Sequence, residues 1–204
     1  MRGVFQASTA ADTTREISAQ VQRRVGERGG VFLYSLINVG PGLLRAPSSE
    51  TWGRGRPMHL DVGAELDEYV ADIARMGSVG TPPAEAAALF EVCMTAQTRV
   101  RAAVGPGVAC GDLWRVGTDA VKTGPGAEYG RLQVHGLGMV SHEPPVVAQD
   151  GTRRLEPGMV LSIETEFRHP DVGHIKIEDS VVVTRDGCEG LGDVDRDWCV
   201  AADG

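Results

Sequence analysis

Two glutamates inside apolar, β-branched runs constrain the fold of this chain more than any other feature. Glu164 lies within Met159–Phe167 and Glu178 within His174–Thr184, and both runs have the composition of strands. The two glutamates are fourteen residues apart, and the midpoint of that spacing falls in the turn-forming stretch 169–173. The sequence therefore predicts a hairpin that sets the two carboxylates opposite each other.

Carboxylates buried in such strands require compensating positive charge. A buried ionised carboxylate is costly unless a cation lies against it. Lys176 is the only cationic side chain close to Glu164 and Glu178 in these two runs. A bound metal ion is the other source of positive charge.

A second pair of acidic residues repeats this arrangement upstream. Asp61 and Asp72 are eleven residues apart, in two segments that favour strand, Met58–Ala64 and Glu68–Arg75. The chain is expected to reverse at their midpoint, so antiparallel pairing would set the two aspartates roughly opposite each other on one face. The spacing gives equal weight to the alternative that one aspartate faces solvent.

Two histidines seven residues apart, His135 and His142, lie in and just after a third predicted strand, Leu132–Val140. A lone strand histidine is more often a core residue than a ligand, so His135 gains weight only as part of a set. That set is hard and oxygen-rich, and it suits a pair of divalent ions about 3.5 Å apart that activate water. Its members are Asp61, Asp72, His135, Glu164 and Glu178.

The remaining elements follow from capping and turn signals. Thr13 and Glu16 form a T-x-x-E capping box, which predicts a helix over residues 12–27. The other predicted elements are a strand at Val31–Val39, a loop at Gly40–Pro57, and helices at 82–104 and 108–123. The loop carries Arg45, Arg54 and Arg56, for which a solvated surface is favoured over contact with a substrate carboxylate.

Composition excludes several function classes. The 204 residues predict one domain (1–204), with a first half at about 9–80, a second at about 81–191 and an acidic tail at 192–204, loosely ordered beyond Trp198. The net charge of −8 argues against nucleic-acid binding. Because the sequence shows neither a membrane span nor a signal peptide, and its four cysteines lack CxxC spacing, we expect a cytoplasmic protein with no membrane partner.

Four motifs occur in order, LDVGAELDEYVADIARM, VHGLGMVSHEPP, LEPGMVLSIE and IKIEDSVVVT. They resemble those of the metallopeptidases with the pita-bread fold, a group that includes methionine aminopeptidases, aminopeptidase P, Xaa-Pro dipeptidase and creatinase. The resemblance covers about residues 31–191 and is greatest to the Xaa-Pro branch. It implies an α+β fold, in which a curved antiparallel sheet is backed by helices.

The resemblance also implies roles for individual residues. The five residues of the set would ligate two divalent ions, with Asp72 and Glu178 as bridges; manganese is the expected metal, and iron, cobalt and zinc are alternatives. His142 would contact the substrate amide and the developing oxyanion, and Glu164 would also handle the proton for the leaving nitrogen.

The chain departs from the family pattern around the expected pocket. The loop before Asp61 lacks the usual histidine, and His59 lies too close to Asp61 to replace it. Lys176 stands where an arginine is usual, and His174 where a glycine is usual. We therefore expect substrate contacts from His142, His174 and Lys176, with weakened recognition of a peptide carboxylate, because lysine lacks the planar fork of arginine.

The first half is expected to lack its first helix, which would leave apolar sheet surface exposed and favour a homodimer or larger oligomer. The function expected is that of a metal-dependent enzyme that hydrolyses an amide bond, most simply in an Xaa-Pro peptide. The alternatives are C–N hydrolysis or related chemistry on another small molecule, and a non-catalytic binding or scaffold protein on the same fold.

Overall fold

A computed structural model describes residues 1–42 and 44–202 of the chain. Its helices are α1 Arg2–Ala7, α2 Thr14–Gly26, α3 Ala84–Ala103, α4 Cys110–Val121 and the 3-10 helix η1 Ala127–Tyr129. Its strands are β1 Val31–Val39, β2 Met58–Leu66, β3 Tyr69–Val79, β4 Gly130–Gly136, β5 Glu143–Val146, β6 Val160–His169, β7 Gly173–Val183, β8 Cys188–Leu191 and β9 Cys199–Ala201. The strands form one sheet in the order β1-β2-β3-β7-β6-β4-β5, with β8 beside β7 and β9 beside β3.

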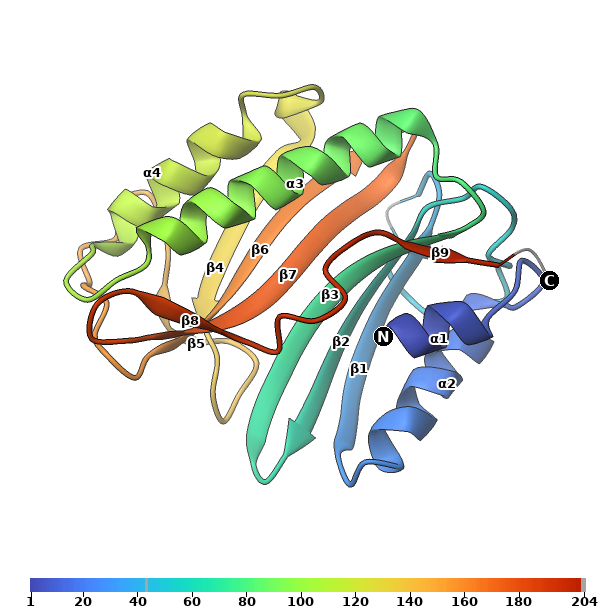
Figure 1. The fold of residues 1–204 in the computed structure, drawn as a ribbon, viewed down its shortest axis with the longest axis horizontal. Coiled ribbons are helices and arrows are strands. Elements are labelled where there is room, and N and C mark those ends of the chain that lie inside the picture. Colours follow the sequence, from blue (N-terminus) through green and yellow to red (C-terminus); the bar gives the residue numbers. More distant parts are fainter. Residues whose placement is uncertain (43, 203–204) are drawn as a thin grey trace.

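The helices cover the sheet in two groups (Figure 1). α3 and α4 lie across β4, β6 and β7, while α1 and α2 lie at the β1 end of the sheet. α3, predicted at 82–104, buries its apolar face in the core, including Leu89, Phe90 and Cys93. The expected antiparallel sheet backed by helices is thus confirmed, and none of the described helices is long and apolar enough to cross a membrane.

The two acidic hairpins differ in register. Glu164 and Glu178 are direct partners across β6 and β7, as the spacing predicts. Asp72 pairs with Gly63, so Asp61 and Asp72 share a face but lie two residues out of line, not directly opposite. The offset arises in the two-residue turn 67–68, where both residues adopt left-handed backbone conformations, with φ of 50° and 70°.

The first half contains one predicted and one unpredicted helix. The capping box at the start of α2 is confirmed, because Thr13 Oγ1 accepts from the backbone N–H of Glu16 and the Glu16 carboxylate accepts from that of Thr13. α1 has no side-chain cap, and for that reason the sequence does not predict it. It forms because Val4 and Phe5 are buried, with the Phe5 ring 5.8 Å from that of Trp52.

The acidic tail is better ordered than the sequence predicts. β9 pairs in parallel with β3, and Ala201 is buried. The Trp198 indole donates a 3.0 Å hydrogen bond to Ser78 Oγ and its ring packs edge-on against Phe90. These contacts join residues that are distant in sequence, so the acidic, Gly-rich composition of the tail does not reveal them.

Candidate metal centre

The side chain of Lys176 lies at the centre of the carboxylate cluster. Its Nζ lies 2.8 Å from Asp61 Oδ2, 2.6 Å from Glu164 Oε2 and 2.8 Å from Glu178 Oε2. Burial disfavours the ammonium, but the three carboxylates outweigh it, Glu178 most, and hold the pKa of Lys176 well above its usual value. Lys176 is therefore an internal counter-charge. Its ammonium contacts carboxylates of the protein, whereas the sequence analysis expected it to contact the substrate.

Asp61 meets a second cation from the loop that precedes β2. Arg45 NH1 lies 3.7 Å from Oδ2 of Asp61, the same oxygen that accepts from Lys176. A solvated surface was favoured for this arginine, but the structure turns it inward, where it lines a pocket over the cluster. Two positive side chains thus balance one aspartate.

Asp72 has far fewer partners than Asp61. Its Oδ2 accepts a 2.6 Å hydrogen bond from the Tyr34 hydroxyl, whereas its Oδ1 is buried without a hydrogen-bond partner. Burial, followed by the charge of Asp61, raises the pKa of Asp72 to about 6. The free Oδ1 is therefore an acceptor that still requires a proton or a cation.

Glu178 also has one satisfied and one unsatisfied oxygen. Oε1 accepts a 2.6 Å hydrogen bond from Ser162 Oγ, while Oε2 contacts Lys176 Nζ without hydrogen-bond geometry. Burial raises the pKa of Glu178 well above its usual value, although the charge of Lys176 opposes this. A single ammonium is thus insufficient to stabilise the ionised form of Glu178.

His135 is oriented by partners on both sides of its ring. Nδ1 lies 3.0 Å from the Gly136 carbonyl oxygen, and Nε2 lies 3.0 Å from Glu164 Oε1. Because a carbonyl oxygen only accepts, Nδ1 carries a proton and Nε2 is the nitrogen directed at the cluster. Burial lowers the pKa of His135, but the hydrogen bond to Glu164 outweighs this and raises it overall.

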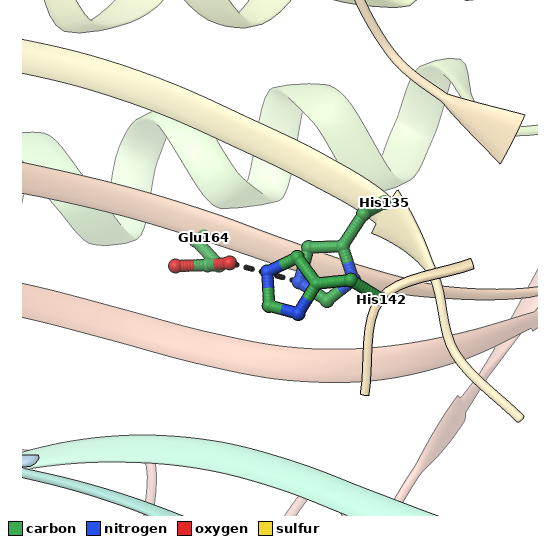
Figure 2. Close-up of side chains that lie close together, drawn as sticks. All are labelled: His135, His142 and Glu164. Atoms are coloured by element: carbon green, nitrogen blue, oxygen red, sulfur yellow. Dashed lines mark hydrogen bonds and ion pairs between the residues drawn. The ribbon is translucent and has the colours of Figure 1, made fainter. Parts of the chain in front are cut away.

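His142 lies exposed beside the pocket and stacks on His135. Figure 2 shows the two rings overlapping, with the Glu164 carboxylate facing their nitrogen atoms; the ring centroids are 3.8 Å apart. Burial and then the neighbouring His135 lower the pKa of His142. Gln133, which the sequence analysis did not select, lies 3.3 Å from His142 Nε2 and donates a 2.8 Å hydrogen bond to Glu164 Oε1.

A divalent ion fits at the end of the cluster formed by Asp72, His135 and Glu178. One ligand atom from each of these buried residues lies within 4.8 Å of the others. Both unpartnered carboxylate oxygens, on Asp72 and Glu178, belong to this group. Carboxylate oxygens with one imidazole nitrogen form a donor set that suits manganese, iron, cobalt or zinc. A second group, His135, His142 and Glu164, meets the same distance criterion.

His174 is not brought into the pocket. It is buried, stacks on His59 with ring centroids 4.2 Å apart, and places Nε2 2.5 Å from Glu166 Oε2. His174 shares a face with Glu178, but four strand residues separate them by about 13 Å. The expected substrate contact is therefore corrected to a buried partner of Glu166.

The pocket over the cluster has a volume of about 230 Å³. Its walls include two residues that the sequence analysis missed, Glu166 and Arg168, which form a 2.8 Å ion pair. Glu166 and Arg168 follow Glu164 by two and four residues, and strand periodicity alone could have placed them on the same face. The full lining is Tyr34, Leu36, Arg45, Asp61, Asp72, Gln133, Ser141, His142, Glu164, Glu166, Arg168 and Lys176.

The model of metallopeptidase family M24 matches residues 2–185 of the chain. The chain belongs to this family. The M24 chain is 32% identical over 145 residues to an Xaa-Pro dipeptidase of Pyrococcus furiosus, which covers 71% of this chain and 42% of that protein. It spans about half the length of the curated relatives it matches.

Solved structures confirm the pita-bread fold predicted from the four motifs. The prolidase from Pyrococcus horikoshii OT3 superposes with a TM-score of 0.89 at 26% identity, over 95% of this M24 chain and 58% of that chain. The X-Pro aminopeptidase from Thermotoga maritima MSB8 gives a TM-score of 0.91 at 25% identity. The match covers 97% of this M24 chain and 58% of the aminopeptidase chain. The resemblance to the Xaa-Pro branch is thus confirmed for the fold and the family.

Proposed function

We propose that the chain is a metal-dependent hydrolase that cleaves an amide bond in a short peptide, most simply one with proline after the scissile bond. The observation that carries this proposal is the buried group Asp72, His135 and Glu178 beneath a pocket, in a chain of family M24. The peptide substrate is supported by the relatives, which are named Xaa-Pro dipeptidase, prolidase and X-Pro aminopeptidase.

Manganese is the divalent metal we propose, because carboxylate-rich donor sets suit it; iron, cobalt and zinc are the alternatives. A divalent ion bound there polarises a carbonyl and lowers the pKa of water. The residues that would hold it are Asp72, His135 and Glu178, which form one converging group. Glu164 converges with His135 in the neighbouring group and would be a further ligand.

His142 and Glu164 are the groups placed to act on the substrate. The exposed His142 ring carries one N–H when neutral, and it can donate to the carbonyl oxygen on which negative charge develops. Glu164 is held by Gln133, His135 and Lys176, which fixes its carboxylate at the pocket wall. We propose that Glu164 passes a proton to the leaving nitrogen.

Two arginines of the pocket, each already beside one carboxylate of the protein, are the groups that could bind an anionic part of the substrate. Arg45 and Arg168 line the pocket, and their planar guanidinium groups suit a carboxylate. The terminal carboxylate of a dipeptide fits this role. A non-peptide C–N substrate that carries a carboxylate is the second candidate, and it is favoured by Arg45, which lies in the loop where family members usually carry a histidine.

We also propose a homodimer. A groove of about 390 Å³ beside α1 and α2 supports it, because its lining is largely apolar, including Val21, Val25, Val62 and Ile73. Light scattering at micromolar concentration tests this proposal, and a monomer would count against it. The cytoplasmic location expected from the sequence stays a prediction.

The peptidase proposal is tested with purified protein reconstituted with Mn²⁺. We expect release of proline from Xaa-Pro dipeptides and little release of alanine from matched Xaa-Ala dipeptides. His142→Ala should lower kcat by about 10²–10³-fold if it stabilises the oxyanion. Absence of turnover on every dipeptide, with metal bound, would contradict the peptidase proposal and favour the second candidate.

A further inference from the structure

The contacts of Lys176 make its ammonium resemble a bound cation. Its Nζ is surrounded by one carboxylate oxygen from each of three strands, β2, β6 and β7, at 2.6–2.8 Å. These are the distances of charge-assisted hydrogen bonds between an ammonium and a carboxylate. The contact with Asp61 is a hydrogen bond, and the contacts with Glu164 and Glu178 are ion pairs. The ammonium therefore occupies the volume between Asp61, Glu164 and Glu178 that a metal ion would need.

Lysine is rare in this chain, which makes its presence at position 176 notable. The chain has 20 basic residues, and only Lys122 and Lys176 among them are lysines. An arginine would place a larger, planar guanidinium here, whereas the lysine ammonium is a compact point charge about the size of a small cation. Lys176 is also only 2% exposed, so its charge is fixed inside the protein.

The two ends of the cluster differ in how far they are neutralised. At one end, Asp61 faces both Lys176 and Arg45. At the other end, Asp72 Oδ1 is buried without a hydrogen-bond partner, and Glu178 and His135 complete a converging group with Asp72. Glu178 Oε2 lies 2.8 Å from Lys176 Nζ, so Glu178 lies between the two ends. Asp61 belongs to neither of the converging ligand groups among the described residues. Only the Asp72 end therefore combines a converging ligand group with a buried carboxylate oxygen, Asp72 Oδ1, that no cation contacts among the described residues.

We propose that the Lys176 ammonium replaces one of the two divalent ions expected in this family, so that the chain binds a single ion at Asp72, His135, Glu164 and Glu178. This inference rests on the proposed metal-dependent function, which it refines. The site would then hold two cations, the Lys176 ammonium and one divalent metal ion, in place of the two metal ions expected from the sequence.

The test measures metal stoichiometry and does not depend on activity. Chelator-stripped protein is dialysed against Mn²⁺, bound metal is counted by elemental analysis, and electron paramagnetic resonance separates isolated from exchange-coupled Mn²⁺. We expect one ion per wild-type chain with the six-line spectrum of isolated Mn²⁺. Lys176→Met removes the ammonium and should raise the stoichiometry to two, with a coupled spectrum.

Two further variants keep the inference falsifiable. Lys122→Met, at the exposed end of α4, is the matched control and should bind one ion like the wild type. Lys176→Arg should also bind two ions, because the guanidinium does not fit among the three carboxylates, and it serves if the methionine variant fails to fold. Two coupled ions in the wild type, or one ion in both Lys176 variants, would overturn the inference and leave the metal-dependent function intact. No bound metal in any variant would overturn both.

Discussion

Tyr34 reaches Asp72 over an intervening strand. Tyr34 on β1 pairs with Gly63 on β2, and Gly63 pairs with Asp72 on β3, so the three residues form a row across the sheet. The Tyr34 hydroxyl donates a 2.6 Å hydrogen bond to Asp72 Oδ2. A Cβ atom at Gly63 would lie 2.3 Å from the Tyr34 ring, so only glycine permits this approach. The row orients one proposed ligand from a distant part of the chain.

Loss of this hydroxyl is expected to weaken metal binding. Tyr34→Phe keeps the ring but removes the only hydrogen bond that the Asp72 carboxylate accepts among the described residues. Because partners that orient ligands typically contribute about 10–100-fold in metal affinity, we expect the Mn²⁺ Kd to rise by that factor. Isothermal titration calorimetry measures it, and Tyr69→Phe, on the exposed end of β3, is the control. An unchanged Kd would show that the hydroxyl does not orient Asp72 for the ion.

Glu178→Gln is expected to weaken metal binding without destabilising the fold. The amide has nearly the same shape as the carboxylate but lacks its charge, so metal affinity should fall by more than about tenfold. Burial raises the pKa of Glu178, so the metal-free variant should be at least as stable as the wild type at pH 7. Urea unfolding with chelator and metal dialysis measure the two effects. Glu156→Gln, at an exposed position, should change neither, and unchanged metal content in Glu178→Gln would exclude it as a ligand.

Asp72 is expected to make the metal-free protein less stable as the pH rises. Its folded pKa of about 6 lies above its ordinary value of 3.8, so the folded state binds more protons between these values. Stability is therefore lost as the pH rises from about 4 to 6, and the loss persists at higher pH. Relative to Asp72→Asn, the wild type should lose about 1–3 kcal/mol of unfolding free energy between pH 4 and pH 7. Urea unfolding with chelator checks this, and parallel curves for the two proteins would contradict it.

Arg75 is expected to be essential for stability at the junction of β3 and β7. Its guanidinium is 2% exposed and donates to the Glu178 carbonyl at 2.7 Å, to Asp179 Oδ1 at 2.5 Å and to the Val194 carbonyl at 2.9 Å. Arg75→Met removes the donors to the buried Glu178 carbonyl and Asp179 Oδ1, while Asp179 Oδ2 keeps its 2.9 Å contact with Arg196. We expect a loss of about 3 kcal/mol in unfolding free energy. The exposed pair Arg115–Asp112 provides the control, since Arg115→Met should cost less than about 1 kcal/mol. Equal losses for the two variants would refute the role of burial.

Much of the site is predictable because strand periodicity and turn chemistry are local properties. The stretch 169–173 fixes the pairing of Glu164 with Glu178, and a spacing of two places Lys176 beside them. The register of Asp61 and Asp72 is shifted because a two-residue turn of non-glycine residues carries no strong sequence signal. The sequence indicated that Lys176 is the local counter-charge of Glu164 and Glu178, and the structure confirms both contacts. Its contact with Asp61 was not predicted, because Asp61 lies on another strand and the sequence does not specify the separation of the strands.

The order of the tail and the roles of Tyr34 and Arg45 depend on contacts between distant segments. Arg45 is drawn inward by Asp61, and β9 is held by its pairing with β3. Neither the Arg45–Asp61 contact nor the pairing of β9 with β3 can be inferred from composition, which shows only that the loop and the tail are polar and Gly-rich. Prediction from sequence therefore succeeds for a hairpin with a clear turn signal, as for Glu164 and Glu178, and fails where side chains of distant segments meet across the sheet.

The β3–β7 junction has a mechanical consequence. Its strand ladder contains one residue pair, Ala74 with Glu178, whereas neighbouring strands are joined along most of their length. Asp72 lies on one side of this junction, and His135 and Glu178 lie on the other. An ion held by all three residues would cross-link two lobes that share little backbone bonding. Loading with metal would thus add a side-chain link to a junction that Arg75 already holds through the Glu178 carbonyl and Asp179.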